Sequence, residues 1–399
     1  MAEAAPRLQP RRWGVRALTF AVAALVSACS TVVPRGPAPP PPAPTAPRPT
    51  APHPVQSGIP EDTERHRVAL LVPITGTNGA VGRSLANATQ LALLDTRSER
   101  VRITTYDTAP GAAAAAQRAI AEGAQLILGP LLAEDVRAVA PIARRARVPV
   151  VSFSNDASVA GQGAYLMGYS PAQSIERVVD YAKNSGVTRF AGLMPTGLYG
   201  ERASTAFLRA VEGAGGSVTA IQTYDRRPGG VTAAVARLGR ASGYQAVLIA
   251  DSAGTASVAV PALRRSGGAG VRVLGTELWN TDSSVGGNAA LAGAWFASVP
   301  DALYRQYATR YRTRFGAAPY RLSSLGYDAV LLTVRIARDW RVGDNFPEGR
   351  LSDRDGFAGL DGAFRFGRDG VADRALEVQE IRGGQTVTVS PAPQGFGGR

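Results

Sequence analysis

Acidic, hydroxyl and aromatic side chains stand directly after several short apolar runs, where they could bind a small polar molecule. Asp251 or Glu277 could pair with a ligand ammonium group, and Tyr199 or Trp279 could stack on its apolar part. Further candidates at comparable positions are Thr75, Gly76, Asn78, Ser154, Asn155, Asp156, Thr196 and Ser252. The first three open a predicted helix, where backbone N–H groups could take a ligand carboxylate. The alternative role for every candidate is a helix cap, a turn or a solvated loop.

Catalytic chemistry has little support in the sequence. His53 stands in a proline-rich segment and His66 begins the first apolar run, so a nucleophile–histidine arrangement has one candidate base. Lys183 follows Ala182 and has Asp180 three residues before it, so neither a Ser-x-x-Lys motif nor a phosphate loop is present. Paired carboxylates for glycan cleavage remain an alternative because the acids are scattered. We expect a non-enzymatic protein with no cofactor and no metal site.

An alternation of apolar runs and amphipathic stretches after residue 65 must position these candidates. The predicted strands are 67–72, 101–106, 125–128, 148–153, 189–194, 218–224, 246–250 and 271–274. The predicted helices between them are 80–97, 112–122, 135–147, 172–185, 201–213, 232–240 and 257–265. Continuous apolar strands flanked by helices predict an α/β fold with mainly parallel sheets covered on both faces. Roughly 330 residues is generous for one such sheet, which favours two lobes.

The alternation changes after residue 297. Two helices are expected at 301–315 and 322–338 without a strand between them. A strand at 362–367 and a hairpin partner at 375–381 are expected around the turn signal Asp369-Gly370. Residues 386–399 are expected to form a frayed tail.

The charge balance of the chain is strongly basic. The formal net charge is +13, and Lys183 is its only lysine. Arginine excess suits attraction to anionic cell-wall polymers or membrane headgroups. No basic cluster with interleaved aromatic residues is present, so nucleic acid is not an expected partner.

The N-terminal segment has the composition of an export signal. Arginines precede an apolar stretch at 17–26, which is too short to span a bilayer of roughly 30 Å. The single cysteine ends the sequence Val26-Ser27-Ala28-Cys29, which resembles a bacterial lipobox. The resemblance implies a signal peptide at 1–28 and lipidation of Cys29. Because Ser30 rather than aspartate follows, it also implies an outer-membrane anchor facing the periplasm. An ordinary secretory signal with a chance or buried cysteine is the alternative.

Residues 29–64 are rich in proline, with alanine, threonine and glycine between. Such a segment cannot form a core and is expected to be an extended, semi-rigid tether. At about 3.1 Å per residue its greatest reach is on the order of 100 Å. A proline-rich ligand for a binding module is the alternative.

The order of several motifs resembles that of type I periplasmic-binding proteins of the branched-chain amino-acid-binding kind. The motifs lie at 70–76, 82–87, 128–131, 148–154, 326–329 and 359–366, and the resemblance covers nearly all of 66–382. With the lipobox and the tether, the chain is most similar to the penicillin-binding protein activator branch, the LppC-like lipoproteins.

This resemblance implies two lobes joined by three crossovers, with a ligand cleft between them. Lobe one is expected at 66–170 plus 300–342, and lobe two at 171–299 plus 343–385. Leu131 and Leu132 stand where amino-acid binders of this kind usually offer hydroxyl groups. The first hypothesis is therefore a lipoprotein that binds and activates a peptidoglycan synthase, a bifunctional penicillin-binding protein. The alternative is a receptor of an ABC transporter for an amino acid or similar small molecule.

Overall fold

The structure is a computed structural model that describes residues 64–396. The predicted signal peptide, the predicted lipidation site Cys29 and the predicted tether up to residue 63 lie outside the described residues. Within residues 64–396 no helix is both long enough and apolar enough to cross a bilayer.

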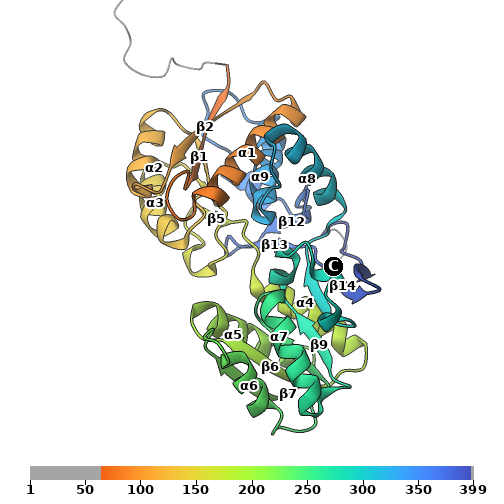
Figure 1. The fold of residues 1–399 in the computed structure, drawn as a ribbon. Coiled ribbons are helices and arrows are strands. Elements are labelled where there is room, and N and C mark those ends of the chain that lie inside the picture. The colour runs from red at the N-terminus through yellow and green to blue at the C-terminus, as the bar shows by residue number, and fades with distance from the viewer. Residues whose placement is uncertain (1–63, 397–399) are drawn as a thin grey trace, which may run out of the picture. The chain divides into compact units, whose positions relative to one another are not determined.

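The first sheet is parallel throughout, with five strands in the order β2-β1-β3-β4-β5. They are β1 (His66–Val72), β2 (Val101–Asp107), β3 (Leu126–Leu128), β4 (Val150–Ser152) and β5 (Ala164–Leu166). Its main helices are α1 (Gly79–Thr96), α2 (Ala112–Ala121), α3 (Ala133–Arg145), α8 (Ala302–Phe315) and α9 (Ser324–Ile336). Helices α1 and α9 lie on one side of β1 and α2 and α3 on the other (Figure 1). Alternate residues of β1 pack on these two faces: Val68 and Leu70 against α1 and α9, Ala69 and Leu71 against α2 and α3. Burial on both faces explains why β1 is an uninterrupted apolar run.

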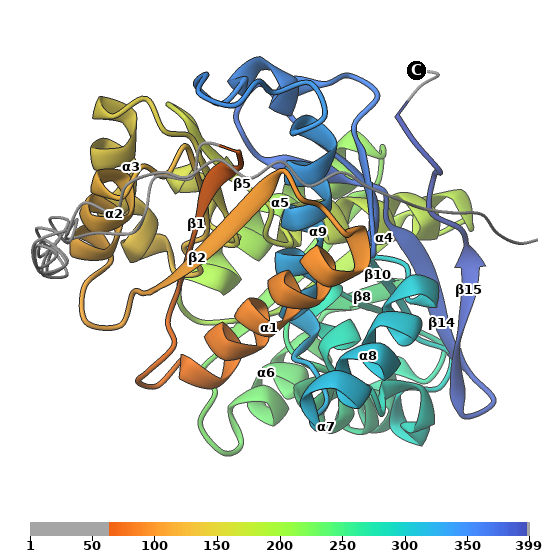
Figure 2. The same cartoon turned by 90° about the horizontal axis from the view of Figure 1, so that it is seen from above.

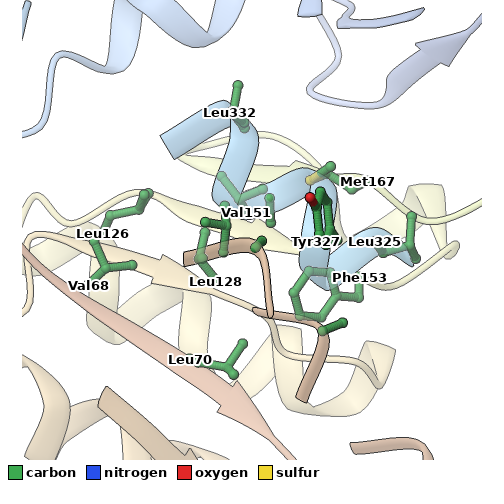
Figure 3. Close-up of a cluster of buried hydrophobic side chains, with 14 of the residues drawn as sticks. Val68, Leu70, Leu126, Leu128, Val151, Phe153, Met167, Leu325, Tyr327 and Leu332 are labelled. Atoms are coloured by element: carbon green, nitrogen blue, oxygen red, sulfur yellow. The ribbon is translucent and has the colours of Figure 1, made fainter. Parts of the chain in front are cut away.

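Aromatic and aliphatic side chains from distant segments fill the space between this sheet and α9. Figure 3 shows Phe153, which follows β4, close to Tyr327 of α9, and Met167, which follows β5, on the other side of the Tyr327 ring. The ends of β4 and β5 and helix α9 therefore share one core, although more than 150 residues separate these strands from α9 in the chain.

The second sheet has seven strands in the order β15-β14-β10-β9-β8-β6-β7. They are β6 (Arg189–Pro195), β7 (Ser217–Tyr224), β8 (Ala246–Ile249), β9 (Arg272–Gly275), β10 (Trp295–Ser298), β14 (Glu377–Arg382) and β15 (Gln385–Ser390). Its helices are α4 (Pro171–Asn184), α5 (Leu198–Gly213), α6 (Gly230–Leu238) and α7 (Ala253–Leu263). The antiparallel pairings of this sheet are β10 with β14 and β14 with β15, and they lie along one edge (Figure 2). Two mainly parallel sheets flanked by helices confirm the predicted two-lobed α/β fold.

The C-terminal segment departs from the predictions in three respects. The predicted strand at 362–367 is β12 (Gly362–Phe366), but its partners are β11 (Phe357–Gly359) and β13 (Ala372–Arg374). The predicted hairpin partner at 375–381 is instead β14 of the seven-stranded sheet. The hairpin prediction was wrong because the turn at Asp369-Gly370 leads first into the short β13, which completes the pairing of β12.

Residues 343–372 do not join the second lobe as predicted. Phe346, Leu351, Phe357 and Phe364 belong to the core of the first lobe, together with β1 and α9. Burial of these large apolar side chains stabilises the packing of the segment on the first lobe, although its neighbours in the chain order were assigned to the second lobe. The predicted frayed tail at 386–399 was also wrong in its first part, because β15 extends β14 with the β-branched run Thr386 to Val389.

The first strand begins at a buried histidine. His66 stacks on Trp340 with ring centroids 3.6 Å apart and planes inclined by 10°. Its Nε2–H donates to the Trp340 carbonyl at 3.1 Å, whereas its buried Nδ1 has no partner within the described residues. Burial lowers the pKa of His66 below its usual value of 6.5, with a smaller contribution from the nearby Arg100.

We expect His66 to make the fold less stable in acid. The folded-state pKa lies below the unfolded value, so the unfolded chain binds more protons and stability falls as the pH drops below 6.5. Replacement of His66 by phenylalanine, which keeps a ring against Trp340, should flatten this dependence. Melting temperatures from pH 5 to pH 8 would test it, with His53→Phe in the proline-rich segment as the control. Parallel curves for His66→Phe and the unchanged chain would contradict the prediction.

Candidate functional site

A cavity of about 360 Å³ lies between the two lobes. Apolar side chains from both lobes make up much of its wall, with amide, hydroxyl and charged groups between them. They are Asn78, Val81, Leu131, Leu132, Phe153, Asn155, Tyr169, Ser170, Gln173, Ser174, Glu277, Leu278, Asn280, Thr281, Ser298, Val299, Arg321, Leu322, Arg374 and Leu376. Size and composition are those of a pocket for a small organic molecule.

The structure brings five of the sequence candidates to this cavity: Asn78, Leu131, Leu132, Asn155 and Glu277. Each follows the carboxyl end of a parallel strand: β1, β3, β4 or β9. The two leucines therefore lie in the wall, at the position where the family resemblance led us to expect a ligand. Their position follows from the general rule that such sheets bind ligands at the carboxyl ends of their strands.

The remaining candidates do not line the cavity. Asp251 accepts hydrogen bonds from the Tyr224 hydroxyl at 2.9 Å and from Arg226 Nε at 3.0 Å, so its charge is matched within the second lobe. Trp279 is 0% exposed, packs on Phe296, and its indole N–H donates to the Asp251 carbonyl at 3.0 Å. Neither residue therefore belongs to the cavity wall: Asp251 forms an internal ion pair, and Trp279 belongs to the core.

Several other candidates have the capping and turn roles named as alternatives. Thr75 donates to Asp107 at 2.6 Å, and the Ser252 hydroxyl caps α7. Asp156 caps the short 3-10 helix Ala157–Val159, and the buried Ser154 hydroxyl accepts from the Asp156 N–H at 3.2 Å. Gly76 provides a turn with φ 70°, and Thr196 is exposed.

Glu277 is the acidic side chain of the cavity wall. Its carboxyl group accepts hydrogen bonds from the Ser174 hydroxyl and, at 3.1 Å, from the Tyr199 hydroxyl. Burial raises the pKa of Glu277, although these hydrogen bonds act in the opposite direction. Tyr199 therefore holds Glu277 in place from outside the cavity instead of stacking on a ligand, as the sequence had suggested.

Two arginines of the wall were missed by the sequence predictions. Arg321 lies in the 3-10 helix Arg321–Ser323 and Arg374 ends β13. Arg321 Nη1 donates to Asp361 at 2.8 Å, and its guanidinium carbon lies 4.0 Å from the centre of the Tyr304 ring. In a chain where all but one of the 44 basic residues are arginines, no sequence signal separates these two from the others.

Two buried carboxyl groups lie near the ion pair of Arg321: Asp361 belongs to it, and Asp328 lies close to Asp361. Asp361 also accepts from the Tyr169 hydroxyl at 2.5 Å, and the charge of Arg321 lowers its pKa despite burial. Asp328 accepts from the Leu360 N–H at 2.6 Å. Burial, reinforced by the charge of Asp361, raises the pKa of Asp328. Asp361 is therefore the ionised partner of Arg321, and Asp328 is the more readily protonated of the two carboxyl groups.

An ion pair joins the two lobes beside the cavity. Asp156, which follows β4, accepts from Arg202 of α5 at 2.6 Å and from Arg137 of α3 at 3.1 Å. Its neighbour Asn155 is part of the cavity wall. Asp156, predicted as a ligand contact, does not line the cavity and pairs with one arginine from each lobe. No group of histidine, cysteine, aspartate or glutamate side chains within residues 64–396 could hold a metal ion.

Comparison with known proteins agrees with this geometry. The family described as periplasmic binding protein matches residues 66–385. Among solved structures, the leucine binding protein LivK of Thermotoga maritima superposes with a TM-score of 0.62 at 20% identity, covering 82% of this chain and 98% of that chain. A solute binding protein of an ABC transporter from Rhodopseudomonas palustris, in complex with 3,4-dihydroxy benzoic acid, superposes with a TM-score of 0.63 at 18% identity. The match covers 82% of this chain and 97% of that chain.

Among curated proteins, an uncharacterized protein of Rickettsia prowazekii is 22% identical over 170 residues. The match spans 42% of this chain and 46% of that protein, so this chain matches less than half the length of that relative.

Proposed function

Because the chain belongs to the periplasmic binding protein family, we propose that it captures a small organic solute in the cavity between its lobes. The observation that carries the proposal is the cavity itself. It measures about 360 Å³ and combines apolar walls with a few charged groups. An amino acid or a small carboxylic acid fits this size and chemistry.

The solved structures of similar fold support the same class of ligand. One is a leucine binding protein, and another holds 3,4-dihydroxy benzoic acid as part of an ABC transporter system. We propose that this chain likewise supplies a solute to an ABC transporter. No catalytic step is part of the proposal, because capture and release need only the two lobes and the cavity between them.

Identification of a bound solute tests the proposal. The full chain with Cys29→Ser would be purified and examined by native mass spectrometry for a stoichiometric small molecule. Calorimetric titration with leucine, benzoate and 3,4-dihydroxybenzoate would follow. Leu132→Trp places a bulky ring in the cavity wall and should weaken binding by roughly tenfold or more through overpacking.

Leu94→Trp is the matched control, because Leu94 is exposed on α1 and does not line the cavity. Equal affinity of the Leu132→Trp and Leu94→Trp variants would place the solute elsewhere. Absence of a co-purified molecule together with no binding of any probe would count against capture.

Activation of a peptidoglycan synthase is the second candidate. It is favoured by Leu131 and Leu132 in the cavity wall, where hydroxyl groups would suit an amino acid better. It also draws on the predicted lipid anchor at Cys29 and the predicted tether, which would place the chain at the outer membrane, facing the periplasm, and raise the effective concentration of a partner. Pulldown from detergent-solubilised envelope should then enrich a bifunctional penicillin-binding protein equally with the unchanged chain and with Leu132→Trp.

A further inference from the structure

One buried cation of the cavity wall lacks a matching anion. Arg374 is only 5% exposed, and one of its nitrogens, Nη2, donates to the Met167 carbonyl at 2.6 Å. Its Nε and Nη1 are buried and have no hydrogen-bond partner within residues 64–396. A guanidinium carries five N–H donors, and leaving them unpaired away from water is costly. Such a group is expected to have a partner when the protein performs its function.

The nearest carboxylates do not provide that partner. Asp361 is hydrogen-bonded to Arg321, Tyr169 and Ser324. Asp328 accepts from backbone N–H groups, and burial raises its pKa. Arg374 acts on both carboxylates through space but forms no ion pair with either. Its charge is therefore balanced less well than that of Arg321.

Aromatic rings hold the Arg374 guanidinium in place. Its central carbon lies 5.2 Å from the centre of the Tyr169 ring and 5.1 Å from that of Phe364. Cation–π contacts of this kind orient the planar group without using its N–H donors. Nε and Nη1 therefore keep their hydrogen-bonding capacity unused within residues 64–396.

A second positive feature lies at the same part of the wall. Helix α4 begins at Pro171, and no side chain caps it at Ser170. Ser170 and Gln173, from the start of this helix, line the cavity with Arg374. The Gln173 side-chain oxygen accepts from the Arg374 backbone N–H at 3.2 Å, which fixes the helix end beside the arginine. Pro171 has no N–H group and the Gln173 N–H donates to the Ser170 carbonyl at 3.2 Å, so the start of α4 favours an anion mainly through its helix dipole.

We propose that Arg374 and the N-terminus of α4 form an anion subsite, so that the captured solute is an acid with an apolar body. The inference rests on the proposed function and specifies its ligand class. The anionic group binds at Arg374, and the apolar body lies against side chains such as Leu131, Val81 and Leu376. Because Nε and Nη1 are enclosed by neighbouring side chains, binding includes a small rearrangement of this wall.

Matched acid and amide probes test the subsite. Calorimetric titration of the full chain with Cys29→Ser would use benzoate and benzamide, then 4-methylpentanoate and 4-methylpentanamide. We expect at least one acid to bind, and to bind more tightly than its amide. Arg374→Met should weaken acid binding by roughly 10- to 100-fold and leave amide binding unchanged, since a hydrogen-bonded charge is lost. Arg374→Lys, which keeps the charge, should retain part of the affinity.

Arg365→Met is the matched control. It removes the same charge from the neighbouring strand β12, where Arg365 pairs with Asp373 at 3.2 Å near the surface. Its acid affinity should equal that of the unchanged chain. If Arg374→Met fails to fold, Arg374→Lys and the acid–amide comparison on the unchanged chain decide the matter.

The possible failures can be told apart. Equal binding of acid and amide, or acid binding that survives Arg374→Met, would overturn the anion subsite while solute capture stands. Binding of neither acids nor amides would overturn the subsite together with this ligand class for the proposed function.

Discussion

Replacement of Arg321 by methionine is expected to lower the free energy of unfolding by about 3–5 kcal/mol. Methionine retains much of the packing on Tyr304 but leaves Asp361 without its cation. Asp361 is 0% exposed, so water cannot replace the lost partner. Urea unfolding followed by circular dichroism at pH 7 would measure the change.

Two further variants define this effect. Arg335→Met breaks the ion pair between Arg335 and Asp353, whose side chains are 50% and 30% exposed, respectively. Because both groups reach water, the variant should lower the free energy of unfolding by at most about 1 kcal/mol. Adding Asp361→Asn to Arg321→Met removes the unpaired charge and should recover part of the loss. Equal costs for Arg321→Met and Arg335→Met would contradict the view that burial decides the value of an ion pair here.

The Arg321→Met deficit should also shrink in acid. Arg321 holds the pKa of Asp361 below its usual value of 3.8, so the pair contributes its full stability above that value. As the pH falls through the folded-state pKa, Asp361 becomes protonated and the contribution is lost. The difference in unfolding free energy between the unchanged chain and Arg321→Met should therefore be largest near neutral pH.

Replacement of Gly200 by alanine is expected to destabilise the second lobe by about 1–3 kcal/mol or more. Gly200 lies in the first turn of α5, and an added Cβ would stand 1.6 Å from the Pro195 carbonyl oxygen. Helix and strand would have to separate to make room. A Cβ added to Gly82 of α1 would stand 1.8 Å from the Pro73 carbonyl oxygen, so the first lobe has the same close approach of helix and strand end.

Gly213→Ala, in the same helix α5, is the matched control. No atom outside its immediate neighbours lies within 4 Å of the added methyl group. Alanine should therefore be neutral or stabilising by up to about 1 kcal/mol, as helix propensity predicts. Thermal and urea unfolding of both variants measure the contrast, and a Gly200→Ala variant as stable as Gly213→Ala would disprove the steric explanation.

The sequence predicted the parallel core well because burial on both faces leaves a strong local signal. The run at 246–250, for example, corresponds to β8 (Ala246–Ile249), all of whose residues are buried. Strands β5, β10, β11, β13 and β15 were missed. The first four have only three or four residues, and β15 lies at a sheet edge, so local sequence gives each of them a weak signal.

The candidate site was predicted only in outline. Glu277 and Leu131 were singled out because they follow the ends of strands, and both line the cavity. Chain direction fixes which edge of a parallel sheet such residues reach. Side-chain direction is decided by packing, so Trp279 turned into the core although its neighbour Leu278 lines the cavity. Arg374 reaches the cavity from the end of the chain through β13, a connection that local sequence does not encode.

The contact between Asp156 and Arg202 bears on how long a solute stays bound. This ion pair spans the lobes beside the cavity, and Arg202 is 33% exposed at its side chain. For the proposed capture of a solute, separation of the lobes requires this contact to break, so we expect the pair to lengthen the residence time without touching the solute. Partial exposure lets salt weaken the pair, and release into the surroundings would then quicken with ionic strength.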